Sequence, residues 1–356
     1  MMTSHDEHLR LGPIAVGVLL ALVAATAFGL TIPVLGWAGA GVGAYSTAAL
    51  LYFGASLASL AQKWLGREAG APLTKAALPP LLVMALAGAA VAPTLLAWGI
   101  QRTGPVTGGL LLNLEAVFTV FFARLVYREF LGRRVVFALG LMTLGGVMLS
   151  LQVQGSVGTS LPGVLAVLGA TVAWGVDNTA SRRLAELRPL SVVAAKGALG
   201  ATLTLILSLL FGEPVPVAWR AGVLLLAGAT GYGVSLRLYL LAQRRIGAAR
   251  TASVFALAPF IGAAVGLLMV PAHIGWSTAV AAVLFGVGVA LHASERHQHP
   301  HHHHATEHEH AHRHDDGHHA HAHEGRVDGE HSHPHAHEPI EHAHEHADDV
   351  HHGHSH

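Results

Sequence analysis

The sequence predicts an all-α membrane protein with ten transmembrane helices, arranged as two inverted repeats of five helices and followed by a disordered cytoplasmic tail. Three observations carry this prediction. The 356 residues are 52% hydrophobic and only 12% charged, whereas a soluble domain carries about 25% charged residues. Ten apolar stretches fill residues 12–292. The second five repeat the first five, and repeats with an odd number of spans lie upside down relative to each other, as in alternating-access carriers.

The repeat is visible when residue n is compared with residue n+143, because the segment boundaries shift together without a gap. The predicted domains are therefore a first repeat at 1–152, a second repeat at 153–294 and the tail at 295–356. Residues that match at this offset include Leu81 and Leu224, Gly88 and Gly231, Gly104 and Gly247, Leu114 and Leu257, Gly132 and Gly275, and Gly145 and Gly288.

A span needs about 20 apolar residues to cross the hydrocarbon of a bilayer. The first span ends near a small-residue stretch that resembles a signal-peptide cleavage site, but cleavage there would break the five-plus-five symmetry. The chain has no cysteine, which excludes disulfides and thiolate metal sites. The expected spans are 12–31, 45–64, 78–100, 105–126, 134–152, 161–181, 190–210, 219–241, 248–270 and 274–292.

Basic residues predict the orientation of these spans, because cytoplasmic loops are enriched in lysine and arginine. The loops on one side of the membrane hold most of them, whereas those on the other side hold only Arg102 and Arg220. Both termini are therefore expected in the cytoplasm, and the protein is expected to be a multi-pass protein of the cytoplasmic membrane. The basic residues on the cytoplasmic side are Lys63, Arg67, Lys75, Arg128, Arg133, Arg134, Arg182, Arg183, Arg188, Arg244, Arg245 and Arg250.

Polar residues inside spans are costly and usually face a cavity or a partner. Glu115, near the middle of the fourth span, is the leading candidate for a substrate-binding or proton-coupling acid, against a structural role between helices. Lys196 and Arg237 lie at similar depths to Asp177, which suggests an ion-pair cluster, although snorkelling is the better interpretation for Lys196. The candidate substrate or coupling-ion residues are Glu115, Asn113, Asp177, Asn178, Arg237, Tyr239 and Trp174, and the candidate gate or helix-break residues are Pro93, Pro259, Arg128 and Glu129.

After Ser294 the composition changes to dense histidine with interleaved acids, 25 of the 29 histidines lying in the tail. The tail has almost no large apolar residues, so we expect it to be disordered. Imidazole is a good ligand for Zn²⁺, Ni²⁺, Co²⁺ and Cu²⁺, although a passive solvated tail or pH buffer is an alternative. The candidate metal ligands are His301, His302, His303, His304, His308, His310, His312, His321, His323, His333, His335, His342 and His344.

Residues 108–150 combine a helix with an internal acid, Glu115, a second acid at its end, Glu129, and a glycine-rich last helix. This pattern resembles the end of an EamA domain of the drug/metabolite transporter superfamily. The second copy, 251–293, keeps Gly275 and Gly288 but has Ala272 in place of the second acid. The resemblance covers about 12–293 and implies a ten-helix secondary carrier of small organic solutes.

These observations favour a proton-coupled exporter that works by alternating access and carries a small metabolite, either amino-acid-like or another small polar or amphipathic solute. The alternative is a Zn²⁺, Ni²⁺ or Co²⁺ exporter, or a metal–metabolite exporter, that uses the tail as a metal collector. The sequence contains no P-loop motif, and we expect neither enzymatic activity nor a required cofactor. The expected partners are the solute, the lipid bilayer and divalent metal at the tail, with no nucleic acid, and a homodimer is left open.

Overall fold

The computed structural model describes most of the membrane region as helices and four short segments of the tail as strands. The described residues are 13–66, 70–128, 131–152, 160–184, 187–246, 248–269, 275–293, 297–302, 306–312, 331–337 and 341–346. The helices of the first half are α1 (Pro13–Gly29), α2 (Thr31–Ala38), α3 (Ala44–Leu65), the 3₁₀ turn η1 (Lys75–Ala77), α4 (Leu78–Met84), η2 (Ala85–Val91), α5 (Ala92–Leu111), α6 (Leu114–Tyr127) and α7 (Arg133–Gln152). Those of the second half are α8 (Leu161–Ser181), the 3₁₀ turn η4 (Arg182–Leu184), α9 (Pro189–Leu210), α10 (Ala218–Ala227), η5 (Gly228–Val234), α11 (Ser235–Ile246), α12 (Ala248–Phe255), α13 (Ala258–Met269) and α14 (Trp276–Ala293).

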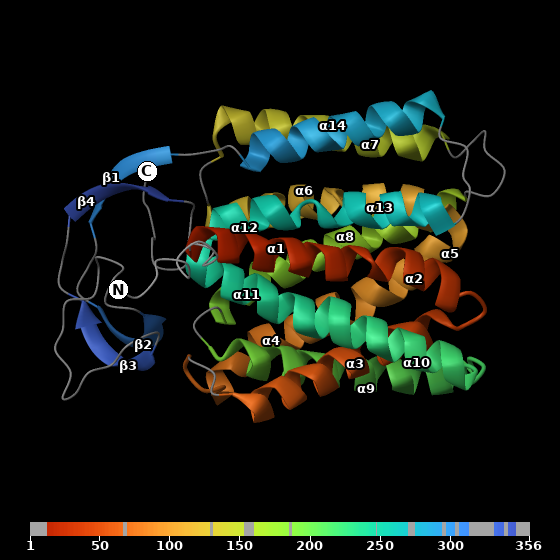
Figure 1. Ribbon diagram of the computed structural model, residues 1–356, viewed down its shortest axis with the longest axis horizontal. Helices are drawn as coiled ribbons and strands as arrows, with labels where there is room; N and C mark the ends of the chain where they lie inside the picture. The colour runs from red at the N-terminus through yellow and green to blue at the C-terminus, as the bar shows by residue number, and fades with distance from the viewer. Residues whose placement is uncertain are drawn as a thin grey trace, which may run out of the picture.

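The helices form a bundle in which the main contacts join the two halves of the chain (Figure 1). Helix α3 packs along α9, α5 along α8, α1 along α11, and α7 along α14. The α7 and α14 pair lies at one side of the bundle and the α3 and α9 pair at the opposite side. The buried core between them draws on both halves, so neither half is a separate globule.

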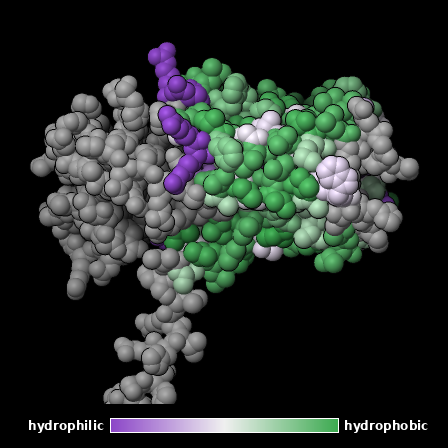
Figure 2. Space-filling view, turned by 90° about the horizontal axis from the view of Figure 1, so that it is seen from above, coloured by the Kyte–Doolittle hydropathy of each residue, from purple (hydrophilic) through white to green (hydrophobic). Residues whose placement is uncertain are grey.

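Seven helices among the described residues are long and apolar enough to cross a membrane. Large apolar side chains such as Leu209 and Leu210 are exposed on them, and Figure 2 shows a hydrophobic surface over the bundle with hydrophilic residues near one end. The chain is therefore a multi-pass membrane protein. The count differs from the predicted ten at three spans. The predicted fourth span is shared between Lys75–Leu111, which runs as one helix through a kink at Gly104, and the shorter α6. The predicted ninth span is divided into α12 and α13, and the tenth corresponds to α14, which is apolar but shorter than the seven.

Several helices begin at a proline, and α8 also begins at a capping residue. Pro13, Pro162 and Pro189 lie in first turns, where the missing N–H of proline costs no helical hydrogen bond. The start of α8 is capped by Ser160, whose hydroxyl accepts a hydrogen bond from the N–H of Gly163 at 3.2 Å. These caps fix the start of the helix that carries the candidate site.

Two π-helical segments occupy corresponding positions in the two halves. Segment η2 covers Ala85–Val91 and η5 covers Gly228–Val234, so each residue of η2 has its counterpart at the offset of 143 found in the sequence. A π-helical turn is rare and is frequently found at functional sites. Both segments pack against the first helices of the opposite half, η2 against α8 and η5 against α1.

Glycine lets backbones approach closely where the halves meet. A Cβ on Gly228 of η5 would overlap the carbonyl of Leu51 in α3, and a Cβ on Gly54 would overlap the carbonyl of Leu225. Only glycine fits at these two positions. Small residues that let helix backbones approach closely are typical of helix interfaces inside membranes. Helix α3 is therefore pressed against η5 and α9 without intervening side chains.

The α3 and α9 pair is tied at both ends by hydrogen bonds to loops. At one end the Glu213 carboxylate accepts from the N–H groups of Tyr45 and Ser46, at 3.1 and 2.7 Å, and so caps α3. At the other end the N–H of Arg188, which precedes α9, donates to the carbonyl of Ala71 at 2.9 Å. Tyr45 and Arg188 differ by the repeat offset of 143, so the two ties correspond to each other.

The described segments of the tail are strands, which differs from the prediction of a disordered tail. Strand β1 (His297–His302) pairs antiparallel with β4 (Glu341–His346), and β2 (Thr306–His312) pairs antiparallel with β3 (His331–His337). For these four segments the prediction of disorder is therefore wrong. The argument considered only the missing apolar residues, whereas the histidines of these segments recur with the period of two that strands have.

Candidate functional site

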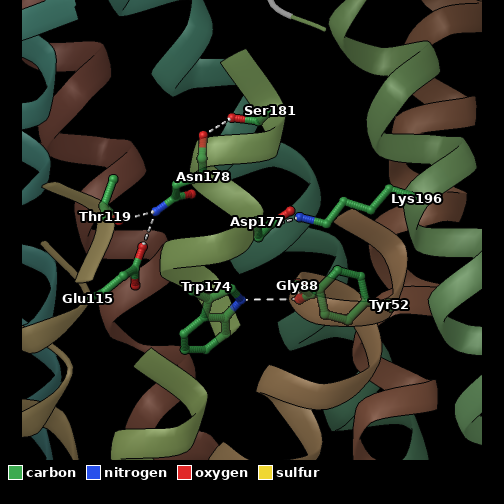
Figure 3. Close-up of polar contacts among 9 residues, drawn as sticks. All are labelled: Tyr52, Gly88, Glu115, Thr119, Trp174, Asp177, Asn178, Ser181 and Lys196. Carbon is green, nitrogen blue, oxygen red and sulfur yellow. Dashed lines mark hydrogen bonds and ion pairs between the residues drawn. The ribbon is translucent and has the colours of Figure 1, made fainter. Parts of the chain in front are cut away.

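The candidate site is organised by α8, whose side chains reach toward α6 on one side and α9 on the other (Figure 3). Asn178 points to Glu115 and Thr119 of α6, and Asp177 points to Lys196 of α9. Adjacent residues on a helix point about 100° apart, so one helix can serve both neighbours. The structure thus brings together the predicted residues Glu115, Asp177, Asn178 and Trp174.

Glu115 and Asn178 form the polar contact between α6 and α8. The Asn178 side-chain N–H donates to a Glu115 carboxylate oxygen at 2.8 Å and to the Thr119 hydroxyl at 3.2 Å. Asn178 is exposed, and Glu115 and Thr119 are half-buried. Glu115 lies in the first turn of α6, directly after a break at Leu112 and Asn113.

Asp177 and Lys196 form a buried ion pair between α8 and α9. Lys196 Nζ lies 2.5 Å from Asp177 Oδ2, and the two side chains are only 12% and 7% exposed. The prediction that Lys196 snorkels to the membrane surface is therefore wrong. The similar depth of Lys196 and Asp177 in the sequence pointed to this pair, but the distance of Lys196 from the helix end favoured snorkelling instead. The second carboxylate oxygen, Asp177 Oδ1, is buried without a hydrogen-bond partner.

The carbonyl of Gly88 in η2 anchors two aromatic side chains. The N–H of Ala92 bonds to the carbonyl of Ala87, five residues back, so the next donor in this pattern would be residue 93. Pro93 has no N–H, and the Gly88 carbonyl is left free. It accepts the Tyr52 hydroxyl at 2.5 Å and the Trp174 indole N–H at 3.1 Å. Pro93, two residues after the end of η2, therefore matters because it lacks the backbone N–H that would otherwise bond to the Gly88 carbonyl.

Trp174 begins a row of six rings that crosses the bundle. Phe28 contacts Trp174, with ring centroids 6.4 Å apart, and also contacts Tyr232 and Phe255 at 5.4 and 5.6 Å. The remaining contacts join Tyr52 to Tyr232 at 5.2 Å and Tyr239 to Phe255 at 5.0 Å. We call these six residues, from α1, α3, α8, η5, α11 and α12, the aromatic row. Trp174 and Tyr239 were expected at the site, and Phe28 stands in the sequence counterpart of the Trp174 stretch, whereas Tyr52, Tyr232 and Phe255 were not predicted.

Arg237 lies elsewhere than the expected ion-pair cluster. Its guanidinium donates to the side-chain oxygen of Gln62 in α3 at 3.2 Å. The expectation of one acid with two bases therefore reduces to the single pair of Asp177 and Lys196 in the described structure. The sequence gives depth along a span but not the direction in which a side chain points.

The remaining predicted residues shape the helices around the site. The Asn113 side chain donates to the carbonyl of Leu110 at 2.9 Å, within its own turn. Pro259 lies in the first turn of α13, just after the break that separates α12 from α13. Arg128 ends α6 in a left-handed conformation, φ 58°, and its carbonyl accepts from Arg124 at 2.8 Å. Glu129 lies outside the described residues.

The predicted metal ligands are spread over the four strands of the tail. His301 and His302 lie in β1, three others in β2, and two each in β3 and β4. Among the described residues, no group of three or more histidine, aspartate or glutamate side chains is placed to hold a metal ion. The ligands outside the described residues are His303, His304, His321 and His323.

Comparison with known proteins agrees with a membrane carrier. The model of the EamA-like transporter family matches residues 15–151 and 161–293. A protein of Methanothermobacter thermautotrophicus named as an uncharacterized transporter is 29% identical over 194 residues, which are 51% of this chain and 55% of the relative. The chain thus matches about half the length of this relative. A protein of known crystal structure aligns with a TM-score of 0.57 and 21% identity, over 77% of this chain and 94% of the other, which shows the fold.

Proposed function

Because the chain belongs to the EamA-like transporter family, and so is a membrane transporter of the drug/metabolite superfamily, we propose that it is a secondary carrier of a small metabolite. The observation that carries the proposal is an ionisable carboxylate inside the bundle. Glu115 is held by the neutral amide of Asn178 at 2.8 Å, where Asn178 is exposed and Glu115 is half-buried. Ionisable residues within a membrane mark solute and ion pathways.

We propose that the carrier has ten spans in two inverted repeats, with both termini in the cytoplasm. Two features support the repeat. The π-helical segments Ala85–Val91 and Gly228–Val234 are related by the same offset of 143 as the sequence, and the main helix pairs join the two halves. Inverted repeats of this kind place the solute near the bilayer midplane, at the interface of the halves. Glu115 and the aromatic row draw on helices of both halves.

Proton coupling at Glu115 is the simplest source of energy for the carrier. Its hydrogen-bond donor, Asn178, is neutral, so this carboxylate can change its charge without breaking an ion pair. Loss of a proton on one side of the membrane and uptake on the other would drive export of the solute. The acid would thus be charged in one half of the cycle and neutral in the other.

The test uses purified protein in proteoliposomes with an imposed pH gradient and a mixed pool of radiolabelled metabolites. Glu115→Gln keeps the size and the hydrogen bond to Asn178 but cannot ionise, and it is expected to abolish gradient-driven flux. The matched control is Thr143→Val on α7, whose hydroxyl bonds only to its own helix at Leu139 and is exposed. Gradient-driven flux that survives Glu115→Gln would overturn the proposal for this site.

For the tail we propose binding of divalent metal, Zn²⁺, Ni²⁺, Co²⁺ or Cu²⁺, with ligands gathered by the ion itself. The density of imidazole supports this, as does the strand register, which places His299 opposite His344 and His310 opposite His333. A metal exporter is disfavoured because the described residues hold no cluster of metal-ligating side chains. Deleting residues 295–356 is expected to remove metal binding in titration calorimetry but leave organic flux. Metal flux that survives the deletion and needs Glu115 would favour the metal exporter.

A further inference from the structure

We propose that the acidic, histidine-rich tail binds the basic end of its own helical bundle, and that divalent metal bound by its histidines releases it. The inference rests on the metal binding proposed for the tail and adds the surface to which the metal-free tail binds. Three features carry it: the opposite charges of tail and bundle, the exposed bases at one end of the bundle, and the point at which the tail leaves α14.

The charges of the two parts of the chain are opposite and equal. Residues 1–294 contain 18 lysine and arginine residues and 8 acids, whereas residues 295–356 contain 3 arginines and 13 acids. With its histidines neutral, the tail therefore carries −10 and the rest of the chain carries +10. Charge complementarity of this kind steers two surfaces together and fixes how they meet.

Exposed bases gather at one end of the bundle, where α3, α8 and α11 end and where α4 and α7 begin. In the described part of the chain none of these bases forms an ion pair. The described acids outside the tail do not neutralise them, because Glu115 and Asp177 lie within the bundle and Glu213 lies where α3 begins. We call the following exposed residues the basic rim: Lys63, Lys75, Arg133, Arg134, Arg183 and Arg245.

The tail leaves the bundle beside this rim, because α7 and α14 pack antiparallel. A Cβ on Gly288 would meet Ala138, and a Cβ on Gly145 would meet Ala281. This register places Arg133, the first residue of α7, level with the last residue of α14. Packed helices lie about 8–10 Å apart, close to the Debye length of about 8 Å at physiological salt. The strands of the tail lie next to this end of the bundle (Figure 1).

The tail is a better partner for the basic rim than anionic lipid, which is the other polyanion at this level. A tethered segment reaches an effective concentration in the millimolar range. The rim draws on helices of both halves of the chain, so one segment with 13 acids can contact several helix ends at once. Lipid head groups bind one at a time.

Metal can reverse the charge of the tail without contacting its acids. A divalent ion bound by neutral imidazole adds two positive charges. The 25 histidines of the tail suffice for about six ions with four ligands each. These ions would add about +12 to a tail that carries −10. The attraction to the rim is then lost.

The experiment measures the distance between tail and rim in the full-length protein, reconstituted in phosphatidylcholine vesicles with and without phosphatidylglycerol. The chain has no cysteine, so two introduced cysteines can carry spin labels without background. Gly66→Cys follows α3 and has nothing within 4 Å of its Cβ, and Ala347→Cys lies beside two acids of the tail. Double electron–electron resonance gives the distance with and without Zn²⁺, which is diamagnetic. Titration calorimetry of the same sample reports Zn²⁺ binding, and size-exclusion profiles report folding.

Four variants separate the charge of the rim, the charge of the tail and metal binding. Arg133→Gln with Arg134→Gln removes two bases of the rim. The matched control, Arg102→Gln with Arg220→Gln, removes two bases at the opposite end of the bundle, where Arg102 lies beside Gly163 and the start of α8. One tail variant replaces the 13 acids by their amides, and another replaces the 25 histidines by glutamine.

We expect a short distance in the wild type that lengthens with Zn²⁺ or with 1 M salt, where the Debye length falls to about 3 Å. The rim variant should lower the ratio of docked to free tail by about tenfold, the effect of losing two exposed ion pairs, and its matched control should leave the ratio unchanged. The tail without acids should be free throughout. The tail without histidines should stay docked when Zn²⁺ is added.

A tail that is free in the metal-free wild type, or that docks equally in the two arginine variants, would overturn the inference. Docking that Zn²⁺ leaves unchanged or tightens, while calorimetry shows Zn²⁺ binding, would overturn it but keep the metal binding proposed for the tail. Docking that is lost when phosphatidylglycerol is present would assign the rim to lipid and overturn it as well. Absence of Zn²⁺ binding would remove both the proposed metal binding and the release.

Discussion

Loss of Lys196 should destabilise the bundle far more than loss of an exposed lysine. Lys196→Met keeps the apolar stem of the side chain and removes the ammonium group that lies 2.5 Å from Asp177. The two side chains are 12% and 7% exposed, so water cannot replace the lost partner. Removing one member of a buried ion pair costs about 3–5 kcal/mol, whereas exposed pairs contribute about 0–1 kcal/mol. We expect the larger cost here, because Asp177 Oδ1 already lacks a hydrogen-bond partner.

The assay is reversible unfolding of the purified protein in mixtures of mild detergent and dodecyl sulfate, with a double-mutant cycle. Asp177→Asn combined with Lys196→Met replaces the ion pair by neutral groups of similar size and should recover most of the lost free energy of unfolding. A single Lys196→Met variant that unfolds within about 1 kcal/mol of the wild type would refute the reasoning, because that is the range of an exposed pair. Lack of recovery in the double variant would show that Lys196 acts through packing.

Three further changes test the packing around the site by the same unfolding assay. Tyr52→Phe and Trp174→Phe should each lower the free energy of unfolding by about 0.5–1.5 kcal/mol, because each removes one donor to the Gly88 carbonyl. The double variant should lose more than the sum, because this carbonyl is then buried without a donor. Additive losses would contradict this. Gly231→Ala should lower the free energy of unfolding by about 1–3 kcal/mol, because the new Cβ would overlap the Thr31 side chain of α2. Gly140→Ala has open space around it and should leave the free energy of unfolding unchanged or raise it. Equal effects of the two substitutions would contradict this packing. Glu213→Gln should lower the free energy of unfolding by about 1 kcal/mol through the weakened cap of α3, and an unchanged value would show that the charge adds nothing there.

Hydrophobicity and the repeat offset predicted the helical membrane architecture, because each span can be recognised from its own residues without knowing which helices it contacts. The apolar stretches correspond to helices, and the offset of 143 reappears in the two π-helical segments Ala85–Val91 and Gly228–Val234. Glu115 and Asn178 were both expected at the site, and the structure joins them at 2.8 Å. Both residues were predicted only from the free-energy cost of placing polar groups inside spans, where such groups need partners.

Pairing between helices could not be read from one sequence. Lys196 and Arg237 lie at similar depths, yet one faces Asp177 and the other Gln62, because the direction of a side chain depends on how its helix is rotated against its neighbours. The role of Gly88 was also hidden. Its free carbonyl follows from Pro93 only once the intervening turn is known to be π-helical, since in an α-helix the donor that Pro93 lacks would serve a different carbonyl.

The two ends of the α3 and α9 pair are fastened by different kinds of group. Where α3 begins, side chains make the ties: the Glu213 carboxylate caps α3, and the Ser46 hydroxyl bonds to the Ser208 hydroxyl at 2.7 Å. Where α9 begins, the Arg188 N–H donates to the Ala71 carbonyl at 2.9 Å, and the Arg188 side-chain Nε donates to the Gly70 carbonyl at 3.0 Å. A substitution of Arg188 therefore leaves a backbone bond in place at its end, whereas the ties at the Glu213 end depend on side chains that a substitution can remove.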